Sequence, residues 1–160
     1  FLQVPEPLIQ KEFSRIMSLK DGSKKMSKSE LSDLSRINLT DSKDQIINKI
    51  KKAKTDPMPM PNGLKELDER PEAKNLLGIY ASLTNTTLEK SIENFYGKNF
   101  SEFKESLSEI LVNKIEPISI EIKKLLADQK YLDQILLEGV EKANLIASKK
   151  IQKIKEIVGF

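Results

Sequence analysis

The spacing of apolar residues predicts helices over most of the chain. From residue 42 onward, apolar side chains recur at intervals of three and four residues, which places them on one face of a helix. This pattern predicts helices that start near residues 42, 71 and 86, followed by two longer helices that reach residue 158. The stripe of the first helix, which we expect to be buried, consists of Ile46, Ile47, Ile50 and Ala53. The stripe of the last helix consists of Leu132, Ile135, Leu136, Val140, Ala143, Ala147, Ile151, Ile154 and Val158.

Capping residues mark where these helices begin and end. Ser, Thr and Asp side chains accept hydrogen bonds from the first turn of a helix, and glycine often follows the last turn. The expected start signals are the capping-box pairs Ser42–Gln45 and Thr86–Glu89, together with Pro71 and Asp128. The expected stop signals are Gly97 and Gly159. Pro117 falls inside the first long helix and predicts a kink there, because proline removes one backbone donor.

The first forty residues show no helical period. Two prolines in the stretch VPEPLI favour extended or turn backbone. The apolar run RIMSL, Arg15–Leu19, predicts a short buried strand that leads into a loop at Asp21 and Gly22. Residues 31–40 are expected to be irregular or briefly extended. Further along, residues 56–62 carry three prolines at alternate positions and therefore predict a stiff, extended connector.

Composition narrows the possible chemistry. The chain has 160 residues and a net charge of only +3, so its overall charge alone does not indicate a nucleic-acid partner. It contains neither cysteine nor histidine, which excludes thiolate catalysis, histidine-dependent triads and most transition-metal sites within these residues. No apolar run is long enough to span a membrane, and no secretory leader pattern is present. We therefore expect a soluble, cytoplasmic protein.

The stretch KKMSKSE, Lys24–Glu30, concentrates hydrogen-bond donors on one loop. Its donors are the ammonium groups of Lys24, Lys25 and Lys28 and the hydroxyls of Ser27 and Ser29, with the hydroxyl of Ser23 just before the stretch. Such a set suits a polyphosphate, and Gly22 supplies the backbone freedom that a closing loop needs. The alternative interpretation is a solvated surface loop without function, since lysine and serine are common in this chain.

The string KMSKS, Lys25–Ser29, is identical to the signature loop of class I aminoacyl-tRNA synthetases. The stretches VPEPLI, RIMSL, KKAKTD, NLLGIY and YLDQILLEGVEKA also resemble landmarks of bacterial tryptophanyl-tRNA synthetases, in the same order. This order matches the tryptophan enzymes better than the related tyrosine enzymes. The resemblance implies a mainly α chain: residues 1–40 would be the C-terminal end of a Rossmann-like catalytic domain, and residues 41–160 a helical anticodon-binding domain of about five helices.

The resemblance also implies roles for individual residues. Lys25 and Lys28 would contact the ATP phosphates and stabilise charge while the aminoacyl adenylate forms, and Lys28 is the stronger candidate for the catalytic effect. The backbone of Met26 would approach adenine, and the serine hydroxyls would shape the loop or reach phosphate. The full set expected to bind ATP is Ile16, Lys25, Met26, Ser27, Lys28 and Ser29. Without the resemblance, Ile16 reads as an ordinary core residue.

The partners implied are ATP with Mg2+, tryptophan and tRNA(Trp), with no metal site in the protein and a homodimer for the full-length enzyme. The family also uses a histidine-containing motif that holds the triphosphate at a helix N-terminus, and this chain has no histidine. We therefore expect the chain to be a C-terminal portion that lacks the tryptophan pocket. By itself it should not form tryptophanyl adenylate.

Residues that contact tRNA cannot be assigned from the pattern. Lysines cluster at positions 49, 51, 52 and 54 and at 149, 150, 153 and 155, where they would suit phosphate contacts or form a solvated helix surface.

Three rival hypotheses about the function of the chain stay open: a helical RNA-binding module with a relic loop, a relative of the tyrosine enzymes, and a helical interaction protein with a chance KMSKS.

Overall fold

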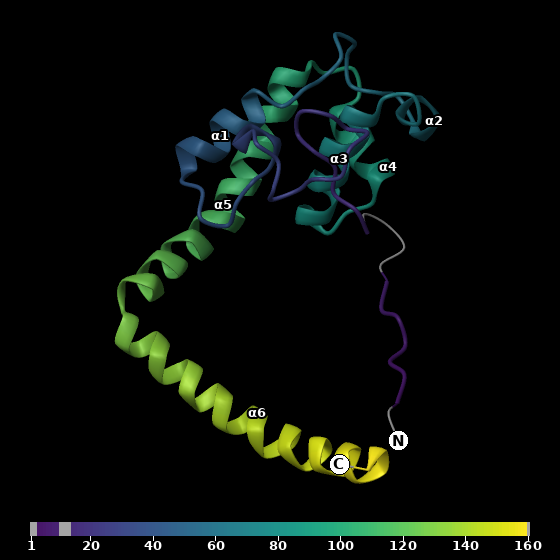
Figure 1. The fold of residues 1–160 in the computed structure, drawn as a ribbon. Helices are drawn as coiled ribbons and strands as arrows, with labels where there is room; N and C mark the ends of the chain where they lie inside the picture. Colours follow the sequence, from purple (N-terminus) through teal and green to yellow (C-terminus); the bar gives the residue numbers. More distant parts are fainter. Residues whose placement is uncertain (1–2, 10–13, 160) are drawn as a thin grey trace. The chain divides into compact units, whose positions relative to one another are not determined.

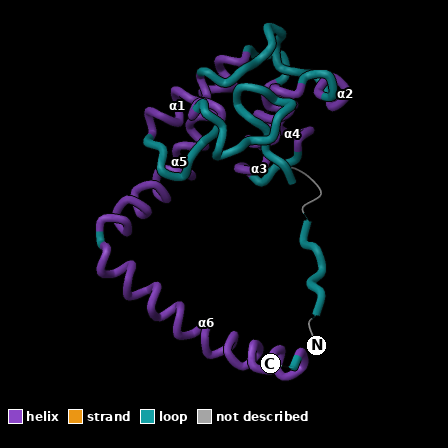
Figure 2. The backbone as a smooth tube through the Cα atoms, viewed as in Figure 1, coloured by secondary structure: helices purple, strands orange, loops and turns teal. Residues whose placement is uncertain are grey.

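The structure is a computed structural model that describes residues 3–9 and 14–159. It divides into two compact units, Phe1–Ser119 and Ile120–Phe160. The helices are α1 (Lys43–Lys51), α2 (Leu64–Leu67), α3 (Pro71–Thr84), α4 (Leu88–Phe95), α5 (Phe100–Ala127) and α6 (Gln129–Val158), with a 3-10 turn at Asp33–Ser35 (Figure 1). The described residues contain no strand ladder, and Figure 2 shows helices joined by loops. The mainly helical fold is confirmed.

The start of α1 follows the predicted capping box. The N–H of Gln45 donates to the hydroxyl of Ser42 at 3.4 Å, and the N–H of Ser42 donates to the Gln45 side chain at 2.8 Å. Ile46, Ile50 and Ala53 are buried as expected, whereas Ile47 is 37 % exposed. The stripe prediction is therefore wrong at Ile47, because adjacent residues on a helix differ in direction by about 100° and only one of the two can face the core fully.

The cap of α4 lies one residue beyond the predicted position. The hydroxyl of Thr87 accepts the hydrogen bond from the N–H of Lys90 at 3.2 Å. The hydroxyl of Thr86 instead lies 2.8 Å from that of Thr84 and 3.2 Å from that of Ser91, so Thr86 links the end of α3 to α4. Adjacent threonines offer the same chemistry to a helix start, and the tertiary contact decides which of them caps it.

The remaining helix ends agree with their signals. Asp128 accepts a hydrogen bond from the N–H of Tyr131 at 3.0 Å, and Gly159 adopts a left-handed conformation after α6. Gly97 also has positive φ, two residues after α4 ends. Pro117 lies inside α5, where the kink stays a prediction. The short helix α2 was not predicted, because its four residues are too few to show a period.

The buried strand predicted at Arg15–Leu19 is wrong as a regular strand. Among the described residues, a single antiparallel bridge forms, between Met17 and Lys25. The N–H of Leu19 donates instead to the carbonyl of Ser35 at 2.9 Å, outside any strand. The segment is partly buried and bends at Arg15 and Leu19, and a loop and a helical side chain satisfy its backbone groups where a neighbouring strand would do so in a sheet.

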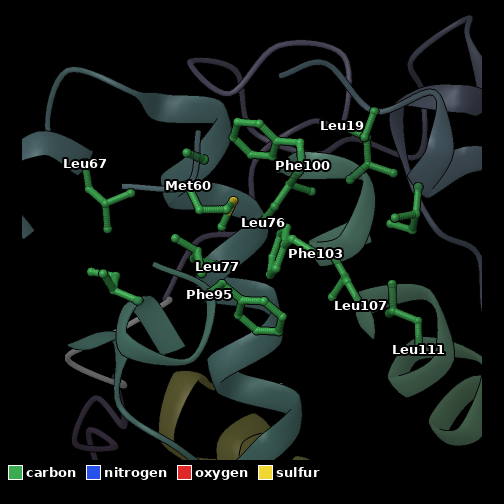
Figure 3. Close-up of a cluster of buried hydrophobic side chains, with 14 of the residues drawn as sticks. Leu19, Met60, Leu67, Leu76, Leu77, Phe95, Phe100, Phe103, Leu107 and Leu111 are labelled. Carbon is green, nitrogen blue, oxygen red and sulfur yellow. The ribbon is translucent and has the colours of Figure 1, made fainter. Parts of the chain in front are cut away.

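The core of the first unit is one apolar cluster that surrounds α3. Figure 3 shows side chains from α3, α4 and α5 gathered around it, with Met60 and Leu19 contributed by loops. The rings of Tyr80 and Phe95 meet edge to face at 4.9 Å, as do those of Phe95 and Phe103. Such aromatic pairs add stability beyond the area that they bury.

The proline connector crosses this core as an ordered loop. Residues 56–62 contain no helix, as predicted, yet Met60 and Pro61 are buried. Buried Arg70 holds the connector: its guanidinium donates to both carboxylate oxygens of Asp56 at 2.7 and 2.9 Å, and to the carbonyl of Pro59 at 2.8 Å. A fourth bond reaches Glu66 at 2.6 Å.

The second unit leaves its apolar stripe in contact with solvent. None of the residues that the structure describes in α6 is buried, and Val140 and Ile151 are 54 % and 51 % exposed. No helix in residues 3–9 and 14–159 is both long enough and apolar enough to cross a membrane.

The boundary expected between residues 40 and 41 rests on the resemblance and stays a prediction. Within the first unit, Leu19 lies in the same apolar cluster as Ile46 and Ile50 of α1. Residues on the two sides of the boundary therefore share one core.

Arg70→Met should lower the free energy of unfolding of the first unit by about 1.5–3 kcal/mol, because it removes charged hydrogen bonds from a buried site. Urea unfolding followed by near-ultraviolet circular dichroism, which reports on Tyr80 in the aromatic cluster, measures this. The matched control is Lys74→Met, whose partner pair with Asp68 is exposed and should change stability by less than about 1 kcal/mol. Equal losses in the two variants would contradict the role given to Arg70.

Candidate functional site

The loop that carries KMSKS is closed at its base by backbone hydrogen bonds. The N–H of Met26 donates to the carbonyl of Ile16 at 3.0 Å, and the N–H of Ser18 donates to the carbonyl of Lys24 at 2.7 Å. Between these bonds, Asp21 organises the turn by accepting from the N–H and hydroxyl of Ser23 at 3.1 and 2.6 Å. These bonds to Ser23 hold the pKa of Asp21 below its ordinary value. The base of the loop is thus ordered before any ligand binds.

The three lysines of the loop differ in their surroundings. The ammonium of Lys24 lies 3.3 Å from the carboxylate of Asp21. Lys25 and Lys28 are exposed, and neither forms an ion pair with a carboxylate in the part of the chain that the structure describes. An unpaired ammonium on an ordered loop is available to an incoming anion, so Lys25 and Lys28 are the two cations that this loop offers.

The other residues of the loop set its shape. The hydroxyls of Ser27 and Ser29 lie 2.9 Å apart, and the N–H of Ser29 donates to the hydroxyl of Ser27 at 3.3 Å. Met26 is partly buried and packs against the apolar cluster of the first unit. The serines therefore brace the tip of the loop, while Met26 attaches it to the core.

Ile16 lies at the same base but faces other residues. It lines a cavity of about 550 Å³ together with Arg15, Met17, Lys74 and Asn75. Neither Lys25 nor Lys28 lines this cavity. The carbonyl of Ile16 contacts the loop, because it accepts the hydrogen bond from the N–H of Met26. Ile16 also lines the cavity, which is separate from Lys25 and Lys28.

The segment that precedes the lysines, residues 17–22, is attached to α3. The side chain of Asn75, which is buried, accepts a hydrogen bond from the N–H of Met17 and donates one to the carbonyl of Met17, both at 2.9 Å. Gly22 packs so closely on the start of this helix that a Cβ there would lie 2.6 Å from backbone atoms of Pro71 and Glu72. Any larger residue at Gly22 would push the loop away from α3.

Downstream of the lysines, ion pairs hold the chain. The ammonium of Lys49, which is only 3 % exposed, lies 2.7 Å from carboxylates of both Asp33 and Asp41. This lysine bond is the first cause that lowers the pKa of Asp33. Arg36 pairs with Asp33 at 3.1 Å and also donates to the carbonyl of Glu30 at 2.9 Å. The loop is therefore fixed on both flanks.

These contacts remove Lys49 from the lysines of the first cluster that could contact RNA, whereas Lys51 and Lys52 are exposed and stay candidates. Lys49 is buried between two carboxylates, and the ammonium of Lys54 lies 2.7 Å from the carboxylate of Glu72. Both lysines stabilise the fold beneath the loop. Sequence spacing did not reveal this, because their partners come from other elements.

Sequence reasoning also missed Asn75. The only hint in the sequence was the residue type: asparagine is a poor helix former, yet it stands in the apolar stretch NLLGIY of α3.

Within the described residues, no group of three or more acidic side chains is arranged to hold a metal ion.

The sequence of the chain matches that of known proteins over most or all of its length. A family model described as "tRNA synthetases class I (W and Y)" matches residues 1–116. The chain is 49 % identical to a tryptophan–tRNA ligase of Agrobacterium fabrum over all 160 residues, and 50 % identical to that of Rickettsia felis over 159 residues. It spans 45 % and 48 % of the lengths of these two relatives.

A solved structure has a similar fold. The crystal structure of tryptophanyl-tRNA synthetase from Mycoplasma pneumoniae resembles 94 % of the chain with a TM-score of 0.75 and 26 % sequence identity. The chain corresponds to 45 % of that structure.

Glu72→Gln should remove an acid-sensitive part of the stability of the first unit. Hydrogen bonding to Lys54 lowers the pKa of Glu72 from its ordinary value of 4.5, so the ion pair stabilises the fold above that pH and loses its effect as the pH falls through the lowered value. Melting temperatures of the wild type and variant should differ at neutral pH and converge in acid. Glu69→Gln, at an exposed position, is the control and should show no such convergence.

Proposed function

This chain belongs to the class I tRNA synthetases for tryptophan and tyrosine, and from that membership we propose that it supplies the signature loop and helical domain of a tryptophan–tRNA ligase. The enzyme would activate tryptophan with ATP and transfer it to tRNA(Trp) in the cytoplasm. Support for tryptophan over tyrosine comes from relatives near 50 % identity, which are tryptophan–tRNA ligases. Because the chain spans less than half of their length, the activity is proposed for the full-length protein.

The observation that carries this proposal is the pair of exposed ammonium groups on Lys25 and Lys28, which form no ion pair with any carboxylate among the described residues. In adenylate formation, a tryptophan carboxylate oxygen attacks the α-phosphorus of ATP, and the bond to the bridging oxygen of pyrophosphate breaks. Negative charge builds up on the departing pyrophosphate. Two ammonium groups on a braced loop stabilise that charge more in the transition state than in bound ATP, which accelerates the step.

The remaining loop residues would orient the nucleotide. Because the N–H of Met26 is engaged with Ile16, a contact between this residue and adenine would use its carbonyl oxygen. The hydroxyls of Ser27 and Ser29 would hold the turn that presents Lys28, and either could donate to a phosphate oxygen. Mg2+ would arrive with ATP as its counter-ion and be held chiefly by the phosphates.

Other parts of the enzyme would complete the site. The histidine motif that holds the triphosphate and the pocket for tryptophan would lie on chain beyond these residues, since this chain has no histidine. Residues 41–160 would receive the anticodon, and residues 1–40 would end the catalytic domain. We expect the full-length enzyme to be a homodimer.

In the full-length enzyme, Lys28→Ala should lower the rate constant of tryptophan-dependent ATP–pyrophosphate exchange by roughly 10²-fold, because one stabilising donor is lost. Lys25→Ala should lower it in the same direction. Lys24→Ala is the matched control one residue away, and it should retain most activity because its ammonium faces Asp21. Exchange at the wild-type rate after both Lys25 and Lys28 are replaced would refute the proposal.

The 160-residue chain by itself should catalyse no exchange, and adding the rest of the enzyme as a separate polypeptide should restore it. Tryptophan should support the restored reaction and tyrosine should not. The rival hypothesis of an RNA-binding module gives the opposite result: the chain would bind tRNA, and no added segment would produce exchange.

A further inference from the structure

We propose that Asn75 is a positioning residue for the signature loop: its side chain fixes on α3 the segment that pairs with Lys25. The expected effect of Asn75 on catalysis rests on the proposed function. The positioning itself rests on contacts between residues of the first unit alone.

The side chain of Asn75 makes the hydrogen bonds to Met17 that a neighbouring strand would make in a sheet. In an antiparallel sheet, a residue in a hydrogen-bonded pair exchanges both its N–H and its carbonyl with the neighbouring strand. Here the carboxamide of Asn75 does the same for Met17, with two bonds of 2.9 Å across 58 positions of sequence. Asn75 is only 8 % exposed, and a buried amide is costly unless it is hydrogen-bonded. The pair therefore fixes Met17 relative to α3.

Met17 in turn fixes the backbone position of Lys25. It forms the single antiparallel bridge with Lys25, through the bonds from Ser18 to Lys24 and from Met26 to Ile16. Asn75 thus lies one residue pair away from the backbone of Lys25. No second strand supports the bridge in the described chain, so a shift of Met17 would move the base of the loop directly.

Gly22 provides a second, independent contact with the same helix. It approaches the backbone of Pro71 and Glu72, at the start of α3, about one turn before Asn75. One contact depends on hydrogen bonds and the other on the absence of a side chain. Together they define both the position and the tilt of the loop on α3. Because a displacement of about 1 Å can reduce a rate by roughly 10²-fold, such support matters for catalysis.

The first experiment measures amide hydrogen exchange in this chain. In Asn75→Ala, the amide of Met17 should lose protection, and the amides of Ser18 and Met26 should exchange at least tenfold faster. Leu107→Ala, a change in the buried core on α5 that should lower stability without removing a hydrogen bond of the loop segment, serves as the control. Unchanged protection at Ser18 and Met26, relative to that control, would overturn the inference whatever the activity of the enzyme.

The second experiment uses the full-length enzyme, where exchange by the wild type tests the proposed function separately. Asn75→Ala and Gly22→Ala should each lower kcat for ATP–pyrophosphate exchange, per titrated active site, by at least tenfold, with little change in the KM for tryptophan. The effect of Asn75→Ala should shrink at least threefold when Lys25 is already alanine, because the positioned group is gone. If Asn75→Ala lowered kcat equally when Lys25 is already alanine, Asn75 would have only a structural role. The same conclusion would follow if Asn75→Ala lowered kcat no more than Leu107→Ala does.

Discussion

The paired hydrogen bonds between Asn75 and Met17 connect the core of the first unit to its candidate site. On one side of Asn75, α3 packs Leu76 and Leu77 into the apolar cluster. On the other, its amide holds a segment that has no strand ladder beside it in the part of the chain that the structure describes. If those two bonds were absent, the N–H and carbonyl of Met17 would lose these partners, and one of the contacts that hold the loop base on α3 would be gone. Asn75 is therefore a direct link between the core helix and the base of the loop, beside the contacts of Gly22 and Met26.

Charge pairing decides which lysines are available for chemistry. Lys49 and Lys54 neutralise carboxylates beneath the loop, and Lys24 faces Asp21. Their pairing leaves Lys25 and Lys28 as the cations that the loop presents to an anion. A polyphosphate site needs this separation, because an ammonium already matched by a carboxylate contributes little to a second anion.

Local signals predicted the helices well and the loop segment poorly. The capping box at Ser42 and the cap at Asp128 are contacts between residues three apart, so spacing alone reveals them. The shift from Thr86 to Thr87 and the exposure of Ile47 depend on what neighbouring elements leave room for. The apolar stretch at Arg15–Leu19 was interpreted as a strand because apolar runs suit strands, although no second strand exists beside it in the described chain.

The sequence by itself determined the helices, the order of landmarks and the string KMSKS, which together indicate the family and the candidate residues Lys25 and Lys28. These are properties of contiguous residues, whose chemistry does not depend on distant partners. Only the tertiary structure decided which lysines remain unpaired, and that Asn75, Gly22 and Arg70 hold the loops in place. Those roles arise from contacts between residues far apart in the chain, and hydrogen-bond partners at such separations leave no periodic trace in the sequence.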